Sequence, residues 1–355
     1  MERRKSRRIT VGGLAIGGGA PVSIQSMTNT DTRDAAATIA QIERLAEAGC
    51  EIVRVAVPDQ AAAQALPEIR RHCPIPLVAD IHFNHVLAIA AAEAGVDKIR
   101  INPGNIGSRQ RVREVVAACR DHGVPIRIGV NSGSVERALL AKYPDDLPRA
   151  MVESALSHAR ILEEEGFFDI CLSMKASDVP TTIAAYQAAA ALCPYPLHLG
   201  VTHAGTPALG KSKAAAGIGG LLAMGIGDTV RVSLSADPVE EVSSAREILR
   251  AVGLRRDFAE VVACPTCGRC QIDLIEIAEA VEAAVSHIRK PIKIAVMGCA
   301  VNGPGEGREA DIGVACGKGD GLLFRKGEIL HKVPRAQIVP ALLELADEVL
   351  NGDML

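Results

Sequence analysis

The sequence predicts an α/β fold, a (β/α)8 TIM-type barrel followed by a small α+β domain. Three observations support this prediction. Short β-branched runs alternate with Ala- and Leu-rich helical patterns along the first 235 residues, the runs number eight, and they recur about every 30 residues. Helical stretches of this kind can serve as crossovers between parallel strands. Eight such units within about 250 residues match a barrel in both count and length.

The eight strands are predicted at Val22–Met27, Glu51–Val57, Pro76–Ile81, Asp97–Asn102, Pro125–Val130, Asp169–Met174, Pro196–Val201 and Thr229–Leu234. The helices between them are predicted at Asp34–Ala48, Ala61–Arg71, Val86–Ala94, Arg109–Asp121, Ala150–Glu165 and Val179–Leu192. An open, doubly wound sheet is the alternative, and a Gly-x-Gly-x-x-Gly turn after the first strand would favour it. No such turn follows that strand, and Gly12-Gly13 and Gly17-Gly18-Gly19 precede it, which indicates an N-terminal hairpin.

A helix from Asp237 ends the barrel, and the stretch Gly253–Phe258 is predicted as a linker that separates residues 1–255 from residues 256–355. The pattern of residues 256–355 differs from that of the barrel and predicts a small α+β domain. Its elements are predicted at Glu260–Ala263 (strand), Asp273–Ile288 (helix), Lys293–Met297 (strand), Asp311–Ala315 (strand), Leu322–Lys332 (hairpin) and Arg335–Leu350 (helix).

The composition excludes several classes of protein. Of 355 residues, 48% are hydrophobic and 23% charged, which is too apolar for a disordered chain. The 39 basic and 42 acidic residues give a net charge of -3, whereas a dedicated nucleic-acid binder shows a basic excess. The charged N-terminus lacks the apolar segment of a secretory signal, and no apolar run reaches the roughly 18 residues that span a bilayer. We therefore expect a cytoplasmic protein with neither a nucleic-acid nor a membrane partner.

Alternation within the predicted strands places polar side chains on one face, because residues i and i+2 point the same way. Five strands each contribute a cation to the inward face: Arg54, Arg100, Arg127, Lys175 and Arg231. The same faces carry Asp80, His82, Asn102, Asn131 and Ser233. Buried charge without a partner is costly, and Asp80 can neutralise only one of the five cations. A structural ion-pair network is the alternative, but the pattern favours an anionic ligand such as phosphate or diphosphate, which Arg binds bidentately.

The ten cysteines fall into two groups by their neighbourhood. Five stand singly in apolar contexts and are interpreted as buried thiols: Cys50, Cys73, Cys119, Cys171 and Cys193. The other five lie in the second domain: Cys264, Cys267, Cys270, Cys299 and Cys316. In a reducing compartment, clustered cysteines indicate metal or redox chemistry more often than disulfides.

Three kinds of site can use the second group. A zinc site of four thiolates would take Cys264, Cys267, Cys299 and either Cys270 or Cys316. A dithiol redox pair needs only Cys264 and Cys267, and it leaves the turn around Cys299 without a role. An iron–sulfur cluster accepts ligands that are spread along the chain, and Gly and Pro allow the backbone to approach the sulfides. Spacing favours the cluster and leaves the other two open.

These turns carry a resemblance to a known family. Cys-Pro-Thr-Cys-Gly-Arg at 264–269 and Gly-Cys-Ala-Val-Asn-Gly-Pro-Gly-Glu at 298–306 closely resemble the 4-hydroxy-3-methylbut-2-enyl diphosphate synthase family of the methylerythritol phosphate route to isoprenoids. The resemblance covers essentially the whole chain. It continues in the barrel at Ser-Met-Thr-Asn-Thr (26–30), Ala-Asp-Ile-His-Phe (79–83), Lys-Ile-Arg-Ile-Asn-Pro-Gly-Asn (98–105), Arg-Ile-Gly-Val-Asn-Ser-Gly-Ser (127–134) and Met-Lys-Ala-Ser-Asp (174–178).

The resemblance implies an oxidoreductase that takes two electrons, opens the ring of 2-C-methyl-D-erythritol 2,4-cyclodiphosphate and releases water. It implies a [4Fe-4S] cluster held by Cys264, Cys267, Cys299 and Glu306, in which the carboxylate leaves one iron exchangeable. Cys270 and Cys316 fall outside that set. The diphosphate is then expected on the five cations, with Asn102, Asn131 and Ser233 as hydrogen-bonding partners.

The resemblance also implies partners and a proton donor. Flavodoxin or ferredoxin is expected to donate electrons, and a homodimer is expected in which the cluster domain of one subunit faces the barrel of the other. Where the family usually has Gly-Val-Thr-Glu-Ala-Gly, this chain has His203 in place of the Glu. A His can serve as acid or base near neutral pH, and Asp80 or His82 are the alternatives.

Two other classes remain possible. A zinc-stabilised barrel acting as a lyase or transferase on a phosphorylated substrate would be colourless. A non-catalytic iron–sulfur carrier would be coloured but would have no use for the basic face of the barrel.

Overall fold

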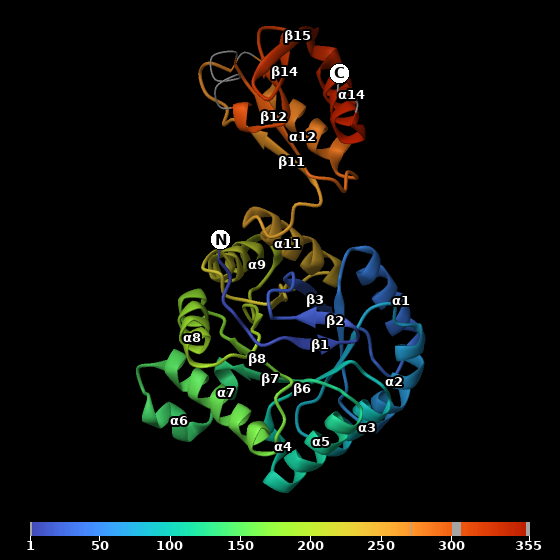
Figure 1. Cartoon of the computed structure of the whole chain (residues 1–355), viewed down its shortest axis with the longest axis vertical. Helices are drawn as coiled ribbons and strands as arrows, with labels where there is room; N and C mark the ends of the chain where they lie inside the picture. Colours follow the sequence, from blue (N-terminus) through green and yellow to red (C-terminus); the bar gives the residue numbers. More distant parts are fainter. Residues whose placement is uncertain (1, 271, 300–306, 353–355) are drawn as a thin grey trace. The chain divides into compact units, whose positions relative to one another are not determined.

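The computed structural model describes residues 2–270, 272–299 and 307–352. It separates into two compact units, Met1–Leu254 and Arg255–Leu355, which Figure 1 shows in blue to yellow and in orange to red. Each unit has its own hydrophobic core.

The first unit is a parallel barrel ringed by helices (Figure 1). Its strands are β3 (Ser23–Met27), β4 (Ile52–Ala56), β5 (Leu77–Asp80), β6 (Lys98–Ile101), β7 (Ile126–Asn131), β8 (Ile170–Lys175), β9 (His198–Leu199) and β10 (Thr229–Val230). Their hydrogen-bonded order is β8-β7-β6-β5-β4-β3-β10-β9. The ends of this order meet where Leu172 bridges Leu197, with the Leu172 N–H donating to the carbonyl of Pro196 at 3.0 Å. The predicted eight-stranded barrel is confirmed, because this bridge closes what would otherwise be an open sheet.

Helices cover the outside of the barrel. The main ones are α1 (Ala35–Glu47), α2 (Gln60–His72), α3 (His85–Glu93), α5 (Arg109–Asp121), α7 (Leu147–Glu164), α8 (Val179–Leu192), α9 (Pro207–Ala214) and α11 (Pro238–Ala251). Acidic caps begin several of them: Asp34 accepts from the Ala37 N–H and Asp178 from the Thr181 N–H. The sequence placed the start of α7 at Ala150, but the helix begins at Leu147, because Asp146 caps it through the Arg149 N–H.

The two faces of the barrel strands differ in chemistry. Outward side chains such as Val53 and Val55 of β4 pack with the helices in the large apolar core. Inward side chains near the amino ends of the strands pack instead against the hairpin of β1 (Ile9–Val11) and β2 (Leu14–Ile16). The predicted N-terminal hairpin is confirmed. Figure 1 shows β1 and β2 inside the ring of helices.

The hairpin closes the amino end of the barrel with apolar side chains. Ile9, Val11 and Ile16 are buried and form one cluster with three inward residues: Ile52, Val78 and Cys171. The turn needs glycine, since Gly12 has φ +54° and a Cβ there would lie 2.7 Å from the Asp97 carboxyl. Within the described residues, the hairpin covers the amino end, and the polar cavity lies at the carboxyl ends of the strands.

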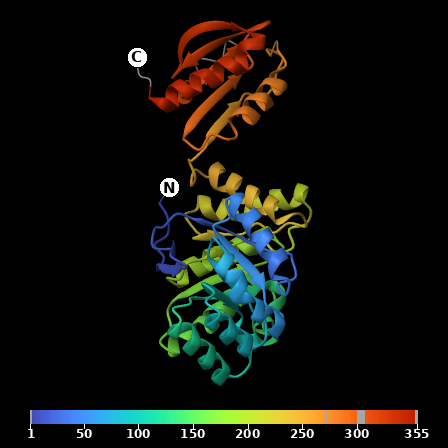
Figure 2. The same ribbon diagram turned by 90° about the vertical axis from the view of Figure 1, so that its right-hand side faces the viewer.

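The second unit is a five-stranded mixed sheet with helices packed on one face (Figure 2). Strands β11 (Ala259–Ala263), β12 (Ile292–Met297) and β13 (Ile312–Cys316) are parallel, and β14 (Asp320–Arg325) and β15 (Glu328–Pro334) continue the sheet antiparallel. Helices α12 (Leu274–Val285) and α14 (Ile338–Asn351) share the apolar cluster with β12, β13 and β14. The predicted α+β domain is confirmed. Among the described residues, no helix combines the length and hydropathy needed to cross a membrane.

Candidate active site

The carboxyl ends of the barrel strands enclose a polar cavity of about 180 Å³. It is lined by Arg54, Asp80, His82, Arg100, Arg127, Asn131, Ser173, Lys175, Thr202, Arg231 and Ser233. The structure thus brings the five predicted cations together around one space. This end of a barrel is where the active sites of such folds are built.

Asp80 is the carboxylate at the centre of this cation group. Its Oδ1 lies 3.2 Å from Arg100 Nη1, and its Oδ2 lies 3.8 Å from Arg54 Nε and 3.5 Å from His82 Nε2. Burial alone would raise the pKa of Asp80, but Arg54, His82 and Arg100 overcome that effect and hold the pKa well below its usual range. Asp80 is therefore ionised at neutral pH and orients two guanidinium groups toward the cavity.

A second carboxylate, Glu241 of α11, holds Arg231. Its Oε2 lies 3.3 Å from Arg231 Nε, and its Oε1 accepts from Arg231 Nη2 at 3.4 Å and from the Leu234 N–H at 3.0 Å. Arg127 forms no ion pair with a carboxylate of the described residues, and its Nη1 donates to Gln25 Oε1 at 3.3 Å. Arg127 is 1% exposed, so this guanidinium is buried with one amide as partner.

Two glycines make room for the cations. A Cβ on Gly129 would lie 2.5 Å from Arg100 Nε, and a Cβ on Gly200 would lie 2.7 Å from Lys175 Nζ. Both positions face inward on their strands, between the cations of neighbouring strands. Any larger residue at 129 or 200 would therefore displace the side chain of Arg100 or Lys175.

The cations repel one another in a buried space. Burial, followed by the charges of Arg127 and Arg54, pushes the pKa of the Lys175 amine well below its usual range. Burial and Arg100 lower the pKa of Arg127 to about 10. Among the described residues, Asp80 and Glu241 are the carboxylates paired with this group, so its positive charge exceeds what they balance. The arrangement is suited to binding a multiply charged anion.

Two of the predicted site residues lie outside the cavity lining. Asn102 is buried beyond Arg100 at the end of β6, and His203 is exposed in the segment after β9, where its φ of +50° is left-handed. Ser173 and Thr202 also line the cavity but were not predicted as site residues. The signal for Ser173 is its position two residues before Lys175 in β8, which puts both side chains on the same face. Glu241 was also missed, because nothing in the sequence of α11 distinguishes a carboxylate that reaches into the barrel wall.

The cysteine turns of the second unit follow two neighbouring parallel strands. Cys264 and Cys267 come after β11, and Cys299 comes after β12, so all three lie at the same edge of the sheet. The Gly298 N–H donates to Cys264 Sγ at 3.1 Å, which ties the two turns together. A Cβ on Gly298 would lie 2.8 Å from Cys270 Sγ and 3.5 Å from Cys264 Sγ, so this position requires glycine. The sulfur of Cys270 thus occupies the space that a side chain at 298 would need, and the bond from Gly298 to Cys264 holds the two turns next to each other.

Cys270 and Cys316 make other contacts. Cys270 Sγ is directed to the Ile272 carbonyl at 3.2 Å, and Cys316 is buried at the end of β13, where burial raises the pKa of its thiol to about 12. The predicted ligand Glu306 lies outside the described residues. Within residues 2–270, 272–299 and 307–352, no three His, Cys, Asp or Glu side chains converge closely enough to hold a metal ion.

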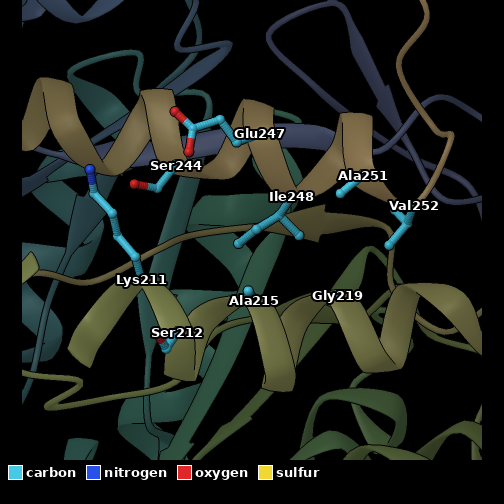
Figure 3. A pocket seen from close by; sticks show the side chains of 9 residues that line it. All are labelled: Lys211, Ser212, Ala215, Gly219, Ser244, Glu247, Ile248, Ala251 and Val252. Atoms are coloured by element: carbon cyan, nitrogen blue, oxygen red, sulfur yellow. The ribbon is translucent and has the colours of Figure 1, made fainter. Parts of the chain in front are cut away.

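A larger groove, of about 410 Å³, lies elsewhere on the barrel surface between α11 and the α9–η2 segment, in which η2 is Ala215–Gly219 (Figure 3). Its lining is mostly apolar, with Ala215, Ile248 and Val252 among its residues. Lys211 and Glu247 are its charged residues, and Lys211 also lies 3.8 Å from Glu240. It lacks the converging charges of the barrel cavity, which is therefore the candidate active site.

Two family profiles match the chain. Residues 6–246 match the GcpE TIM-barrel domain, and residues 260–348 match the GcpE protein C-terminal domain. The chain is 58% identical over 348 residues to a Geobacter sulfurreducens protein named 4-hydroxy-3-methylbut-2-en-1-yl diphosphate synthase (flavodoxin), covering 98% of this chain and 99% of that one. A Bacillus subtilis protein of the same name is 58% identical over 345 residues, covering 97% and 92%.

Solved structures share the barrel at low sequence identity. A truncated 3-deoxy-D-arabino-heptulosonate 7-phosphate synthase from Thermotoga maritima superposes with a TM-score of 0.51 at 13% identity, covering 70% of this chain and 94% of that one. The 3-dehydroquinate dehydratase from Geobacillus kaustophilus gives 0.50 at 14% identity, covering 71% and 100%. These similarities concern the fold.

Replacing Asp80 tests whether the cation group needs a negative charge. We expect Asp80→Asn to lower the melting temperature and to destabilise the barrel by about 3–5 kcal/mol, because Arg54 and Arg100 lose their carboxylate. Added sulfate should raise the melting temperature of the variant more than that of the wild type, since the anion takes the place of the carboxylate. The stabilisation from Asp80 is present at neutral pH and is lost as the pH falls below the usual carboxyl range.

The matched control is Asp31→Asn, which removes a carboxylate from an exposed pair with Arg33. It should melt like the wild type at every sulfate concentration. If Asp80→Asn also behaved like the wild type throughout, the cations would not depend on a negative charge at this position.

Proposed function

The chain belongs to the GcpE family, and from that premise we propose that it is a flavodoxin-dependent 4-hydroxy-3-methylbut-2-en-1-yl diphosphate synthase. The resemblance predicted from the cysteine turns is confirmed at the level of the family. In the proposed reaction, 2-C-methyl-D-erythritol 2,4-cyclodiphosphate takes up two electrons, its ring opens and one oxygen leaves as water. The enzyme is an oxidoreductase of isoprene biosynthesis.

The observation that supports this function best is the excess of cations in the barrel cavity. Arg54, Arg100 and Arg127 can each donate two parallel hydrogen bonds to a phosphate, and Lys175 adds a point charge. A cyclic diphosphate carries one negative charge on each phosphorus, so it neutralises part of the excess that Asp80 and Glu241 leave. Asn131 and Ser233 lie in the same lining and are proposed as hydrogen-bonding partners, together with Asn102.

In this proposal the barrel residues bind and orient the substrate. Asp80 fixes the guanidinium groups of Arg54 and Arg100, and Glu241 fixes that of Arg231, so these donors are in place before the substrate arrives. Preorganised donors of this kind stabilise the negative charge that remains on the diphosphate when the ring opens. The closed amino end of the barrel confines the substrate to the carboxyl end.

We further propose that Cys264, Cys267, Cys299 and Glu306 hold a [4Fe-4S] cluster. A cluster held by these residues would supply the electrons for the reduction. The position of Cys264 beside Gly298, at the edge shared by β11 and β12, supports the thiolate part of this set. Glu306 follows Cys299 closely in the sequence and is proposed as the fourth ligand.

The partners follow from the same proposal. Flavodoxin is the proposed electron donor, with ferredoxin as the alternative. The cations lie in the unit Met1–Leu254 and the cysteines of the cluster in Arg255–Leu355, and we propose that the enzyme is a homodimer in which the cluster domain of one subunit faces the barrel of the other. A cytoplasmic location is proposed because the cysteines of such a site require reduction.

His203 is proposed to carry a proton to the substrate at the mouth of the cavity. It follows Thr202, which lines the cavity, and its exposed side chain can exchange protons with water. Asp80 and His82 are the alternatives, but Asp80 is held ionised by its cations and makes a poor acid. The proton allows the oxygen lost from the substrate to depart as water.

Turnover is the first test of the function. The full-length protein, purified without oxygen and supplied with reduced flavodoxin, should convert the cyclic diphosphate to 4-hydroxy-3-methylbut-2-enyl diphosphate. Arg127→Met should lower kcat/KM by about a hundredfold or more, because a buried charged contact to the diphosphate is lost. Lys211→Met, in the groove of Figure 3, should leave the rate unchanged. No conversion by the cluster-loaded wild type would rule the function out.

The cluster ligands can be tested by colour and metal content. Cys264→Ser, Cys267→Ser and Cys299→Ser should lose most of their iron and visible absorption, whereas Cys270→Ser should retain both. The difference is expected because a cluster needs its thiolates and Cys270 is proposed to lie outside the set. A colourless wild type that contains zinc would instead support the zinc-stabilised lyase or transferase.

The role of His203 can be tested by a pH profile. His203→Ala should lower kcat about a hundredfold, which is typical when a general acid is lost, while leaving KM nearly unchanged. His203→Glu should recover much of the rate and shift the profile toward lower pH, because a carboxyl group titrates lower than imidazole. Unchanged turnover in His203→Ala would show that the proton comes from another donor, such as His82 or water.

A further inference from the structure

A sixth cation lies inside the barrel, below the five that line the cavity. Lys98 is at the start of β6, two residues before Arg100 on the same inward face. Its side chain is 0% exposed, and its Nζ has no hydrogen-bond acceptor among the residues that the structure describes. A fully buried ammonium without an acceptor is among the most costly groups that a protein can contain.

Among the described residues, no carboxylate forms an ion pair with Lys98. The titratable groups that interact with it come from other strands: Arg54 on β4, Arg127 on β7, Cys171 on β8 and His198 on β9. The Cys171 thiol is buried and neutral, since burial raises its pKa. Below this level the β1–β2 hairpin presents Ile9, Val11 and Ile16. The carboxyl group of Asp228, farther along the barrel, is engaged by Arg3 and Arg4.

The balance between cations and anions in the barrel interior links Lys98 to the ligand. The interior holds Arg54, Lys98, Arg100, Arg127, Lys175 and Arg231. Against them stand the carboxylates of Asp80 and Glu241. A cyclic diphosphate adds one negative charge on each phosphorus, so even the loaded barrel holds more cations than anions when every amine is protonated. Arginine does not release its proton in proteins, so any adjustment falls on the lysines.

We propose that Lys98 is a proton-uptake site coupled to substrate binding: its amine is neutral in the empty barrel and becomes an ammonium when the diphosphate enters. The amine then adds a positive charge beneath the anion only when that anion is present. This inference rests on the proposed function, because the ligand is taken to be a dianion in the barrel cavity. Lys98 acts on the substrate through the electrostatic potential of the cavity and is a positioning residue.

The protonation behaviour of the free protein is consistent with this proposal. Burial lowers the pKa of Lys98 to about 7, with Cys171 opposing this effect and Arg127 and Arg54 adding to it, so the neutral amine predominates above that pH. A nearby dianion favours the ammonium and raises the pKa of Lys98. Affinity should therefore increase as the pH falls from the raised pKa of the complex to about 7, and should level off below that value.

Two other buried groups could take up protons in the same way. His198 has both ring nitrogens unpartnered among the described residues, and burial with Lys175 and Arg127 keeps its pKa far below neutrality. Lys175 lines the cavity and touches the ligand in the proposed function. The experiment must therefore assign the proton to Lys98 itself.

Isothermal titration calorimetry measures the uptake directly. The full-length, cluster-loaded protein is titrated anaerobically without reductant, in buffers of different ionisation enthalpy, with the cyclic diphosphate and separately with sulfate. Neither ligand titrates between pH 6 and pH 9, so any proton taken up is bound by the protein. Wild-type protein should take up between about half and one proton per site at pH 8, and much less at pH 6.

Two variants assign the proton. Lys98→Met and Lys98→Arg should both lose most of the uptake at pH 8, because neither side chain gains a proton there. Lys98→Met should weaken binding about fifteenfold or more at pH 6 and less at pH 9, whereas Lys98→Arg should bind with little dependence on pH. Lys98→Met is expected to fold, because it replaces an unpartnered buried amine by an apolar chain of similar length. Lys213→Met, at a partly exposed lysine of α9, is the control and should match the wild type.

The outcomes separate this inference from the proposed function. Uptake that is the same in Lys98→Met and the wild type would overturn the role of Lys98 and assign the proton to Lys175 or His198. Failure of the cyclic diphosphate to bind, together with sulfate-linked uptake that disappears in Lys98→Met, would reject the proposed substrate and retain the proton site. Sulfate binding without any uptake would reject the proton site alone.

Discussion

An excess of positive charge confined inside a closed barrel is the constraint on which the other features of this structure depend. Five cations line one cavity, and Lys98 lies beneath them. The carboxylates of Asp80 and Glu241 orient three of the guanidinium groups without balancing the whole set. Burying so much like charge costs stability, so the interior is built for an anion and not for packing alone. The proposed cyclic diphosphate would supply two further negative charges, one on each phosphorus.

The rest of the barrel makes this interior possible. The outward faces of the strands are aliphatic and bury the helices, which provides the apolar core that offsets the polar lumen. The β1–β2 hairpin closes the amino end with Ile9, Val11 and Ile16, so that one end remains for the ligand. Gly129 and Gly200 leave the space that Arg100 and Lys175 occupy. In the second unit, Gly298 has the corresponding role beside the sulfur of Cys270.

Much of this could be predicted from the sequence, because periodicity reports directly on backbone geometry. The eight β-branched runs gave the strands, and alternation within them indicated which side chains face inward, as the shared cavity of Arg54, Arg127 and Arg231 illustrates. Periodicity does not report the distances between side chains of different helices and strands. Glu241 lies on a helix whose sequence resembles any amphipathic surface helix, and only the fold shows that it reaches Arg231. Lys98 shares the parity of Arg100, but its depth and lack of an acceptor depend on the hairpin and on neighbouring strands.

A crystal structure of the full-length protein with the cyclic diphosphate bound, grown anaerobically, tests the central claim most directly. The account predicts both phosphates inside the barrel cavity, with their oxygens within hydrogen-bond distance of Arg100, Arg127 and Lys175. It also predicts that Asp80 keeps its contacts with Arg54 and Arg100. The account would be contradicted by a diphosphate that binds elsewhere, for example in the groove between α9 and α11, and makes no contact with the barrel cations.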